Sequence, residues 1–238
     1  PYWVARVNRN WDHRDRIMGS GSVTYHFTPW LSGMVRSGTD WYQDNRKRVF
    51  AAGTIGQSGV DENGAFGEGN VFRQETNTDF LFTASPENLG DFTVTVNMGG
   101  NRRDTDYRSN DVYVRNLVIP GLYDLGNAAV TPDLGDWREE VRVNSLYGAA
   151  RIGYKDTYFM DFTGRNDWSS TLPENSNSYF YPSVSGGIIL SDLVTVPGLD
   201  YAKVRMGWTE VGNDASPYSL VDPYVARTPF GGVPRYTA

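Results

Sequence analysis

Residues 154–190 constrain the fold most, because they hold two runs of alternating side chains around a polar loop. In the first run, Met160 and Phe162 alternate with Asp161 and Thr163. The second run repeats the alternation, with aliphatic residues at one parity and serines at the other. Successive side chains of a strand point to opposite faces. The segment therefore predicts two strands with one apolar and one polar face, as in a half-buried soluble sheet or a transmembrane barrel.

Bulk composition removes several classes of protein. The chain has no cysteine, which excludes a disulfide scaffold. A net charge of -6 and a pI of about 5.0 argue against a nucleic-acid binder. Mean hydropathy is -0.49, and no stretch approaches the roughly 18 apolar residues that a membrane helix needs. If this chain crosses a membrane, it must therefore cross as strands of a closed barrel.

Eight alternating segments predict eight antiparallel strands in four hairpins. Each segment is about 10–12 residues long, near the length with which a tilted strand crosses the hydrocarbon. Connections within hairpins are short and those between hairpins are long, which is typical of outer-membrane barrels. The predicted strands are 17–27, 31–41, 74–83, 92–101, 143–153, 157–165, 179–190 and 201–211, and the long connections are 42–73, 102–142 and 166–178.

The remaining polar motifs do not predict chemistry. Residues 53–69 are rich in glycine but lack the Gly-Lys-Ser/Thr ending of a phosphate loop, so we predict a flexible loop there. Asp40, Asp136 and Asp167 each precede a tryptophan, but adjacency in sequence does not make the carboxylate pair of a glycosidase. Two histidines without cysteine do not predict a transition-metal site. We therefore expect no catalytic residue, no metal and no cofactor.

Parity divides the strand residues into two sets with different expected surroundings. An apolar set is predicted to face lipid, and a charged set is predicted to face the barrel interior, where its members pair with one another or contact cargo. The first set is Val23, Met160, Phe162, Val184, Ile188, Val204 and Met206. The second set is Arg36, Arg151, Asp161, Arg165, Lys203 and Arg205.

Two stretches resemble recurring sequences near the C-terminal end of SusC/RagA-type TonB-linked outer-membrane transporters. The first is GRNDWSSTLP followed by SYFYPSVS, and the second is KVRMGWTEVGNDASPYSL, from Lys203 to Leu220. Residues 2–42, with their PYW opening and the charged run at 12–16, are also similar to a hairpin of that family. The residues that match the motifs are Gly164, Arg165, Asn166, Asp167, Trp168, Tyr181, Pro182, Gly212, Asn213 and Asp214.

The resemblance implies a part of a barrel of about 22 strands that encloses a plug. It implies an outer-membrane importer, not an enzyme, that takes up oligomeric glycans or peptides with energy supplied through TonB. The implied partners are a SusD-like surface lipoprotein, the TonB complex, an oligosaccharide or peptide cargo and the lipid bilayer, with no nucleic acid. Neither the plug nor the TonB-contacting region is recognised in residues 1–238, which we expect to be an internal part of the barrel.

Two other functions fit the alternating pattern. One is a soluble, secreted β-rich domain that binds or hydrolyses carbohydrate. The other is a passive porin or an adhesin. A requirement for detergent separates the importer from the first, and an upstream plug separates it from the second. Cargo identity depends on individual loop residues, which the fold does not determine.

Overall fold

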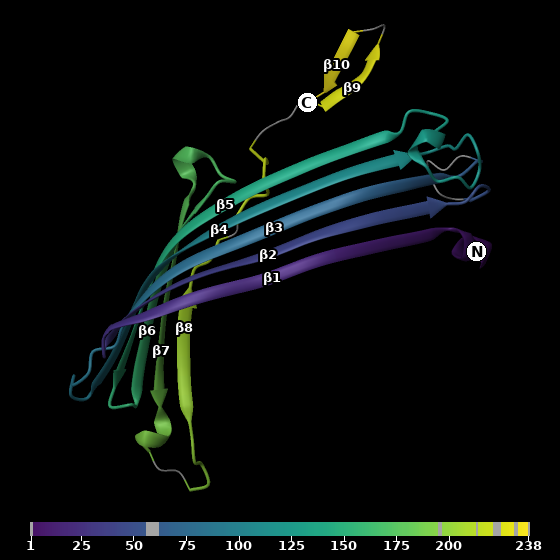
Figure 1. Cartoon of the computed structure of the whole chain (residues 1–238). Coiled ribbons are helices and arrows are strands. Elements are labelled where there is room, and N and C mark those ends of the chain that lie inside the picture. The colour runs from purple at the N-terminus through teal and green to yellow at the C-terminus, as the bar shows by residue number, and fades with distance from the viewer. Residues whose placement is uncertain are drawn as a thin grey trace. The chain divides into compact units, whose positions relative to one another are not determined.

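The computed structural model describes residues 2–55, 62–194, 197–212, 214–220, 225–230 and 233–237. Its main element is an eight-stranded antiparallel sheet in which the strands follow one another in sequence order (Figure 1). The predicted all-β fold, with eight sheet strands in four hairpins, is confirmed. The strands are β1 (Arg9–Thr28), β2 (Leu31–Phe50), β3 (Ala65–Ala84), β4 (Phe92–Val114), β5 (Asp133–Tyr154), β6 (Tyr158–Ser169), β7 (Ser178–Ile189) and β8 (Lys203–Thr209).

Several short elements lie outside this sheet. A helix precedes β1. Two further strands near the C-terminus pair with each other and, within the described residues, with no other strand. The sequence pattern predicted neither of these features. None of the described helices has both the length and the apolar character that a membrane crossing requires. The elements are α1 (Tyr2–Val7), the 3-10 turns at Leu125–Asn127, Glu174–Ser176 and Leu190–Asp192, and the hairpin of β9 (Val225–Phe230) and β10 (Val233–Thr237).

The first five strands are about twice as long as predicted. They contain 20, 20, 20, 23 and 22 residues. The predicted connections 42–73 and 102–142 were therefore wrong, because β2 continues to Phe50, β3 begins at Ala65, β4 continues to Val114 and β5 begins at Asp133. The predicted glycine-rich loop was also wrong from residue 65 onward, where β3 begins. The third long connection is 170–177, shorter than predicted.

Polar pairs across neighbouring strands explain the extra length. Alternation is visible in a sequence only where one face is dry, so a segment that is polar on both faces does not stand out as a strand. Opposite charges facing each other across a sheet stabilise the strand pair. The pairs in these extensions are Arg14–Asp44 at 2.7 Å, Arg16–Asp40 at 2.6 Å, Lys47–Glu68 at 2.6 Å and Asn70–Asn45 at 2.6 Å.

The chain divides into two compact units, and the five long strands belong to both. The first unit holds residues 1–20, 38–76 and 104–140, and the second holds 21–37, 77–103 and 141–238. A small buried core in the first unit consists of Val49, Phe66, Val114 and Leu117, packed against Tyr123 and Ala128.

Short connections of the second unit lie side by side. The amide of Ser85 donates to the carbonyl of Trp30 at 2.8 Å. The amide of Lys155 donates to the carbonyl of Asp91, also at 2.8 Å. Aromatic rings gather beside these turns, as in the interfacial belt of a barrel. The ring pairs are Phe27–Phe82 at 6.4 Å, Phe92–Tyr154 at 4.8 Å and Tyr154–Tyr158 at 6.2 Å.

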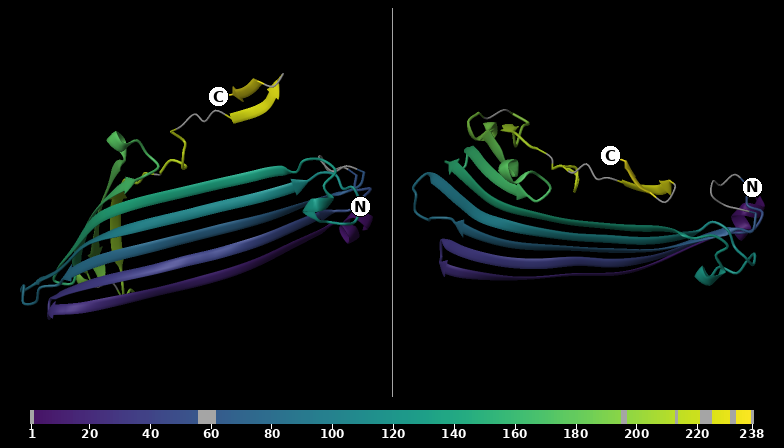
Figure 2. Two further views of the ribbon diagram at one scale, coloured as in Figure 1. Left: turned by 45° about the horizontal axis from the view of Figure 1, so that its top comes forward. Right: turned by 90° about the horizontal axis from the view of Figure 1, so that it is seen from above.

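Strands β5 to β8 sort their side chains onto the two faces as the parity predicts. Phe162 lies opposite Ala150 on one side and Val184 on the other, whereas the neighbouring Asp161 lies opposite Arg151. These strands continue the sheet in sequence order (Figure 2). Within the described residues no second sheet covers the apolar face, on which Phe162 and Met206 are 40% and 79% exposed. Outer strands β1 and β8 do not pair with each other in the described residues.

Candidate functional site

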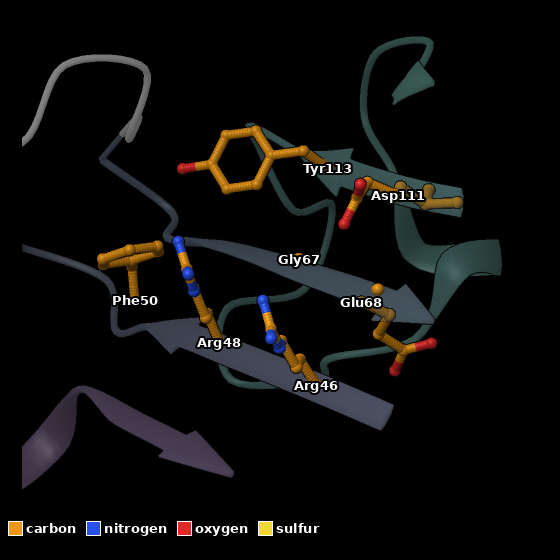
Figure 3. Close-up of a pocket in the computed structure, with 9 residues that line it drawn as sticks. Arg46, Arg48, Phe50, Gly67, Glu68, Asp111 and Tyr113 are labelled. Carbon is orange, nitrogen blue, oxygen red and sulfur yellow. The ribbon is translucent and has the colours of Figure 1, made fainter. Parts of the chain in front are cut away.

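A pocket of about 370 Å³ lies in the first unit, across three adjacent strands (Figure 3). This volume falls within the roughly 300–1,000 Å³ of ligand pockets. Alternate residues of each strand place their side chains on one face of the sheet. They are Arg46, Arg48 and Phe50 from β2, Gly67 and Gly69 from β3, and Asp111 and Tyr113 from β4, and the intervening Glu68 and Val112 also line the pocket.

Two glycines make the floor of this pocket. A Cβ atom at Gly67 would lie 3.0 Å from the ring of Tyr113. A Cβ atom at Gly69 would collide with the carboxylate of Asp111. Because glycine has no side chain, the groups from β4 lie directly over the backbone of β3. The glycine-rich segment predicted to be a loop thus forms part of the pocket.

The carboxylate of Asp44 binds two arginine side chains beside the pocket. Arg46 donates from Nε and Nη2 to Oδ2 of Asp44, at 3.1 and 2.8 Å, and Arg14 donates to the same oxygen at 2.7 Å. The side chain of Asp44 is only 3% exposed. Three hydrogen bonds from two guanidinium groups therefore meet at one buried carboxylate.

Arg48 differs from its neighbour Arg46. Within the described part of the chain, it forms no ion pair or hydrogen bond, and its side chain is exposed. Figure 3 shows Arg48 and Arg46 projecting from β2 beside the groups that project from β4. The rings of Phe50 and Tyr113 meet edge to face, with centroids 6.4 Å apart and planes at 78°. An uncompensated guanidinium thus lies beside an aromatic pair.

A second constellation, in the second unit, is centred on Arg165. Its Nε donates to Asp167 at 2.7 Å, and its Nη2 donates to the hydroxyl of Ser145 at 2.8 Å. Its Cζ lies 6.0 Å from the ring of Tyr147, and Tyr181 lies directly opposite Arg165 on β7. With its charge paired to Asp167 on its own strand, Arg165 links β6 to β5 through Ser145 rather than offering an unpaired cation.

Asp214 links the segment after β8 to the end of β6 and to the connection that follows it. Its carboxylate accepts hydrogen bonds from the hydroxyls of Ser169, at 2.5 Å, and Thr171, at 2.8 Å. Both hydroxyl residues are buried. This contact joins residues more than forty positions apart, so the sequence motif alone did not reveal the two partners.

The other motif residues surround these two centres. Gly164 would place a Cβ atom 3.2 Å from the ring of Phe180, and Asn166 donates to Ser178 at 2.8 Å. Trp168 ends the β6–β7 pairing opposite Ser178, and Pro182 lies opposite Gly164. Gly212 lies against Tyr181, and Asn213 is outside the described residues.

Replacing Asp214 by alanine should loosen the 170–177 connection. The two buried hydroxyls would lose their shared acceptor, and an unsatisfied buried polar group costs about 1–3 kcal/mol. We expect faster amide hydrogen exchange in this connection, with unchanged exchange in β1. Asp200→Ala, at an exposed carboxylate with no hydrogen bond or ion pair among the described residues, is the matched control. Equal amide exchange rates in both variants would contradict a role for Asp214 in holding the 170–177 connection in place.

Most of the residues predicted to face the interior share one face. Arg151 pairs with Asp161 at 2.6 Å, and Arg36 pairs with Asp79 at 2.9 Å. Lys203 lies over the ring of Phe159 at 4.7 Å. By the register of β5 to β8, the residues Arg151, Asp161, Arg165, Lys203 and Arg205 fall at one parity of the sheet. That this face lines a barrel interior stays a prediction.

Comparisons with known proteins agree on the kind of fold. No family model matches the sequence. The TonB-dependent receptor P26 of Formosa agariphila is 28% identical over 86 residues, which cover 35% of this chain and 8% of the receptor. The structure of the RagAB peptide transporter is similar over 99% of this chain, with a TM-score of 0.87 and 14% identity. The 'open-open' state of the RagAB peptide importer gives a TM-score of 0.77 at 13% identity.

This chain spans 27% of the length of the similar RagAB chain. At such low identity the likeness shows a shared fold, an open stretch of sheet that corresponds to part of a larger barrel. The predicted resemblance to RagA-type transporters is confirmed at that level.

Proposed function

We propose that this chain is a part of the barrel of a TonB-dependent outer-membrane importer of the SusC/RagA type. The observation that carries the proposal is the match of 99% of the chain to the RagAB transporter, at a TM-score of 0.87. The exposed apolar face of β6 to β8 supports it. Water would disfavour such a face on a soluble sheet, whereas lipid solvates it.

In this proposal the sheet forms part of the barrel wall and contributes to the selection of the cargo. The apolar parity faces the bilayer, and the polar parity lines the route of the cargo. Within the hydrocarbon every backbone group must be paired, so β1 and β8 would pair with strands outside these residues. The conformational movement that lets the cargo pass would come from a plug and a TonB-contacting region elsewhere in the protein. Transport of this kind makes and breaks no covalent bond in the cargo.

The proposed partners follow from the same relatives. The RagAB structures are described as a peptide transporter, which favours an oligomeric peptide as the cargo over a glycan. A SusD-like lipoprotein would cover the outer end of the barrel. The pocket on β2, β3 and β4 is the place in this chain where we expect the cargo to bind.

Cysteine labelling of whole cells tests the orientation. The chain contains no cysteine, so each introduced thiol is unique within it. Asn63 is exposed in the 51–64 connection, and Lys155 is exposed in the turn between β5 and β6. We expect a membrane-impermeant maleimide to label Asn63→Cys on intact cells, and Lys155→Cys only after the outer membrane is permeabilised. Labelling of both on intact cells, or recovery of the protein without detergent, would favour a soluble secreted domain.

A further inference from the structure

We infer that the pocket on β2, β3 and β4 binds a carboxylate of a peptide cargo through the guanidinium groups of Arg48 and Arg46. The inference rests on the proposed function, because it names the chemistry of the cargo that the importer would recognise. Along the sequence, both arginines keep the parity of Arg36, which is predicted to face the interior.

The donors for an anion are already in place. Arg48 has all its N–H groups free of partners among the described residues. Arg46 uses Nε and Nη2 on Asp44, which leaves Nη1 for a ligand. The two residues are two positions apart on one strand, so their Cα atoms are separated by roughly 7 Å. Two guanidinium groups at that spacing suit one carboxylate between them, and such charge-assisted pairs are among the stronger hydrogen bonds.

An acceptor lies across the pocket from these donors. The carboxylate of Asp111 accepts a hydrogen bond from Ser109 at 2.9 Å and, within the described residues, meets no cation closely enough for an ion pair. It therefore retains capacity for an N–H group of the ligand. A carboxylate and an N–H donor within one short ligand are what a peptide provides.

The aromatic pair favours a peptide over an acidic sugar. Phe50 and Tyr113 meet edge to face, so they do not form one flat platform on which a sugar ring would stack. The angled pair suits a compact apolar side chain of a peptide instead. We therefore assign the pocket to a peptide end and treat an acidic oligosaccharide as an alternative outcome of the test.

The test measures binding to the full-length detergent-purified protein that contains this chain. The probes are a fluorescent tetrapeptide whose only acidic group is its C-terminal carboxylate, the C-terminal amide of the same tetrapeptide, and an oligogalacturonate. We expect the free acid to bind at least tenfold more tightly than the amide. Arg48→Gln should remove that difference and leave the affinity of the amide unchanged, and Arg48→Lys should restore part of it.

Arg138→Gln is the matched control, because Arg138 is an exposed arginine of β5 that does not line the pocket. It should leave both affinities unchanged. Equal binding of acid and amide by the unaltered protein, or an equal loss of both in Arg48→Gln, would overturn the inference. So would binding of oligogalacturonate alone. In each case TonB-dependent uptake by cells would still support the importer, whereas uptake that persists without TonB would instead refute the proposed function.

Discussion

Arginine in place of Met206 is expected to block assembly of the barrel more strongly than any other single change considered. Met206 lies on β8 at the apolar parity, opposite Gly186, and is 79% exposed. An arginine on the lipid face near the bilayer midplane costs about 2–4 kcal/mol. The fraction of folded protein should therefore fall, as measured by urea titration of the full-length protein refolded into lipid vesicles.

Thr209→Arg provides the control for this change. Thr209 is exposed on the same strand but lies at the polar parity, opposite Ser183. We expect it to shift the urea midpoint far less than Met206→Arg. Equal shifts for the two variants would mean that the two faces of β8 meet the same solvent, and the transmembrane assignment would then be wrong.

A methyl group at Gly99 is expected to produce the second large effect. An added Cβ atom would lie 2.5 Å from the carbonyl oxygen of Phe80 and 2.7 Å from the ring of Tyr147. The first of these atoms belongs to the backbone of β3, which moves only if strand pairing shifts. Overpacking of this kind costs about 1–3 kcal/mol. Gly99→Ala should therefore lower the thermal midpoint of the detergent-solubilised protein.

Gly148→Ala is the counterpart of this substitution. Gly148 lies within the inner strand β5, and a Cβ atom there would meet only the carbonyl oxygen of Asn97 at 3.8 Å, an ordinary contact. Alanine restricts the unfolded chain more than glycine does, so this variant should match or slightly exceed the parent in stability. A lower midpoint for both variants would show that crowding at Gly99 is not the cause.

The sequence predicts the fold best where one face of the strand is dry. In β6 and β7 the alternation around Phe162 and Val184 indicated strands within a few residues of their true bounds. The extension of β2 past Trp41 was missed, because Asp44 and Arg46 on one face and Asn45 and Lys47 on the other give no contrast between the two faces. Asp44 is held to β1 by Arg14 and Lys47 to β3 by Glu68, and a single sequence does not reveal such pairings.

The candidate pocket shows a similar limit. Arg48 and Tyr113 are 65 positions apart, and only the register of β2, β3 and β4 brings them to one hollow. Gly67 and Gly69 had the composition of a loop, although here they serve the close approach of neighbouring groups. By contrast, Arg165 and Asp214 were identified through the family motif, but their partners Ser145 and Ser169 were not.

The carboxylate of Asp44 is shared by two arginines, and this has an electrostatic consequence at long range. One positive charge is left over beside a third, unpaired guanidinium at Arg48, and the Asp111 carboxylate across the pocket offsets one of these two charges, in a chain whose net charge is -6. We therefore expect a positive local potential from the remaining charge, opposite in sign to the net charge of the chain. It reaches about 8 Å at physiological ionic strength and roughly 3 Å in 1 M salt. Acidic solutes are thus drawn toward this face before they touch it, and added salt slows their arrival.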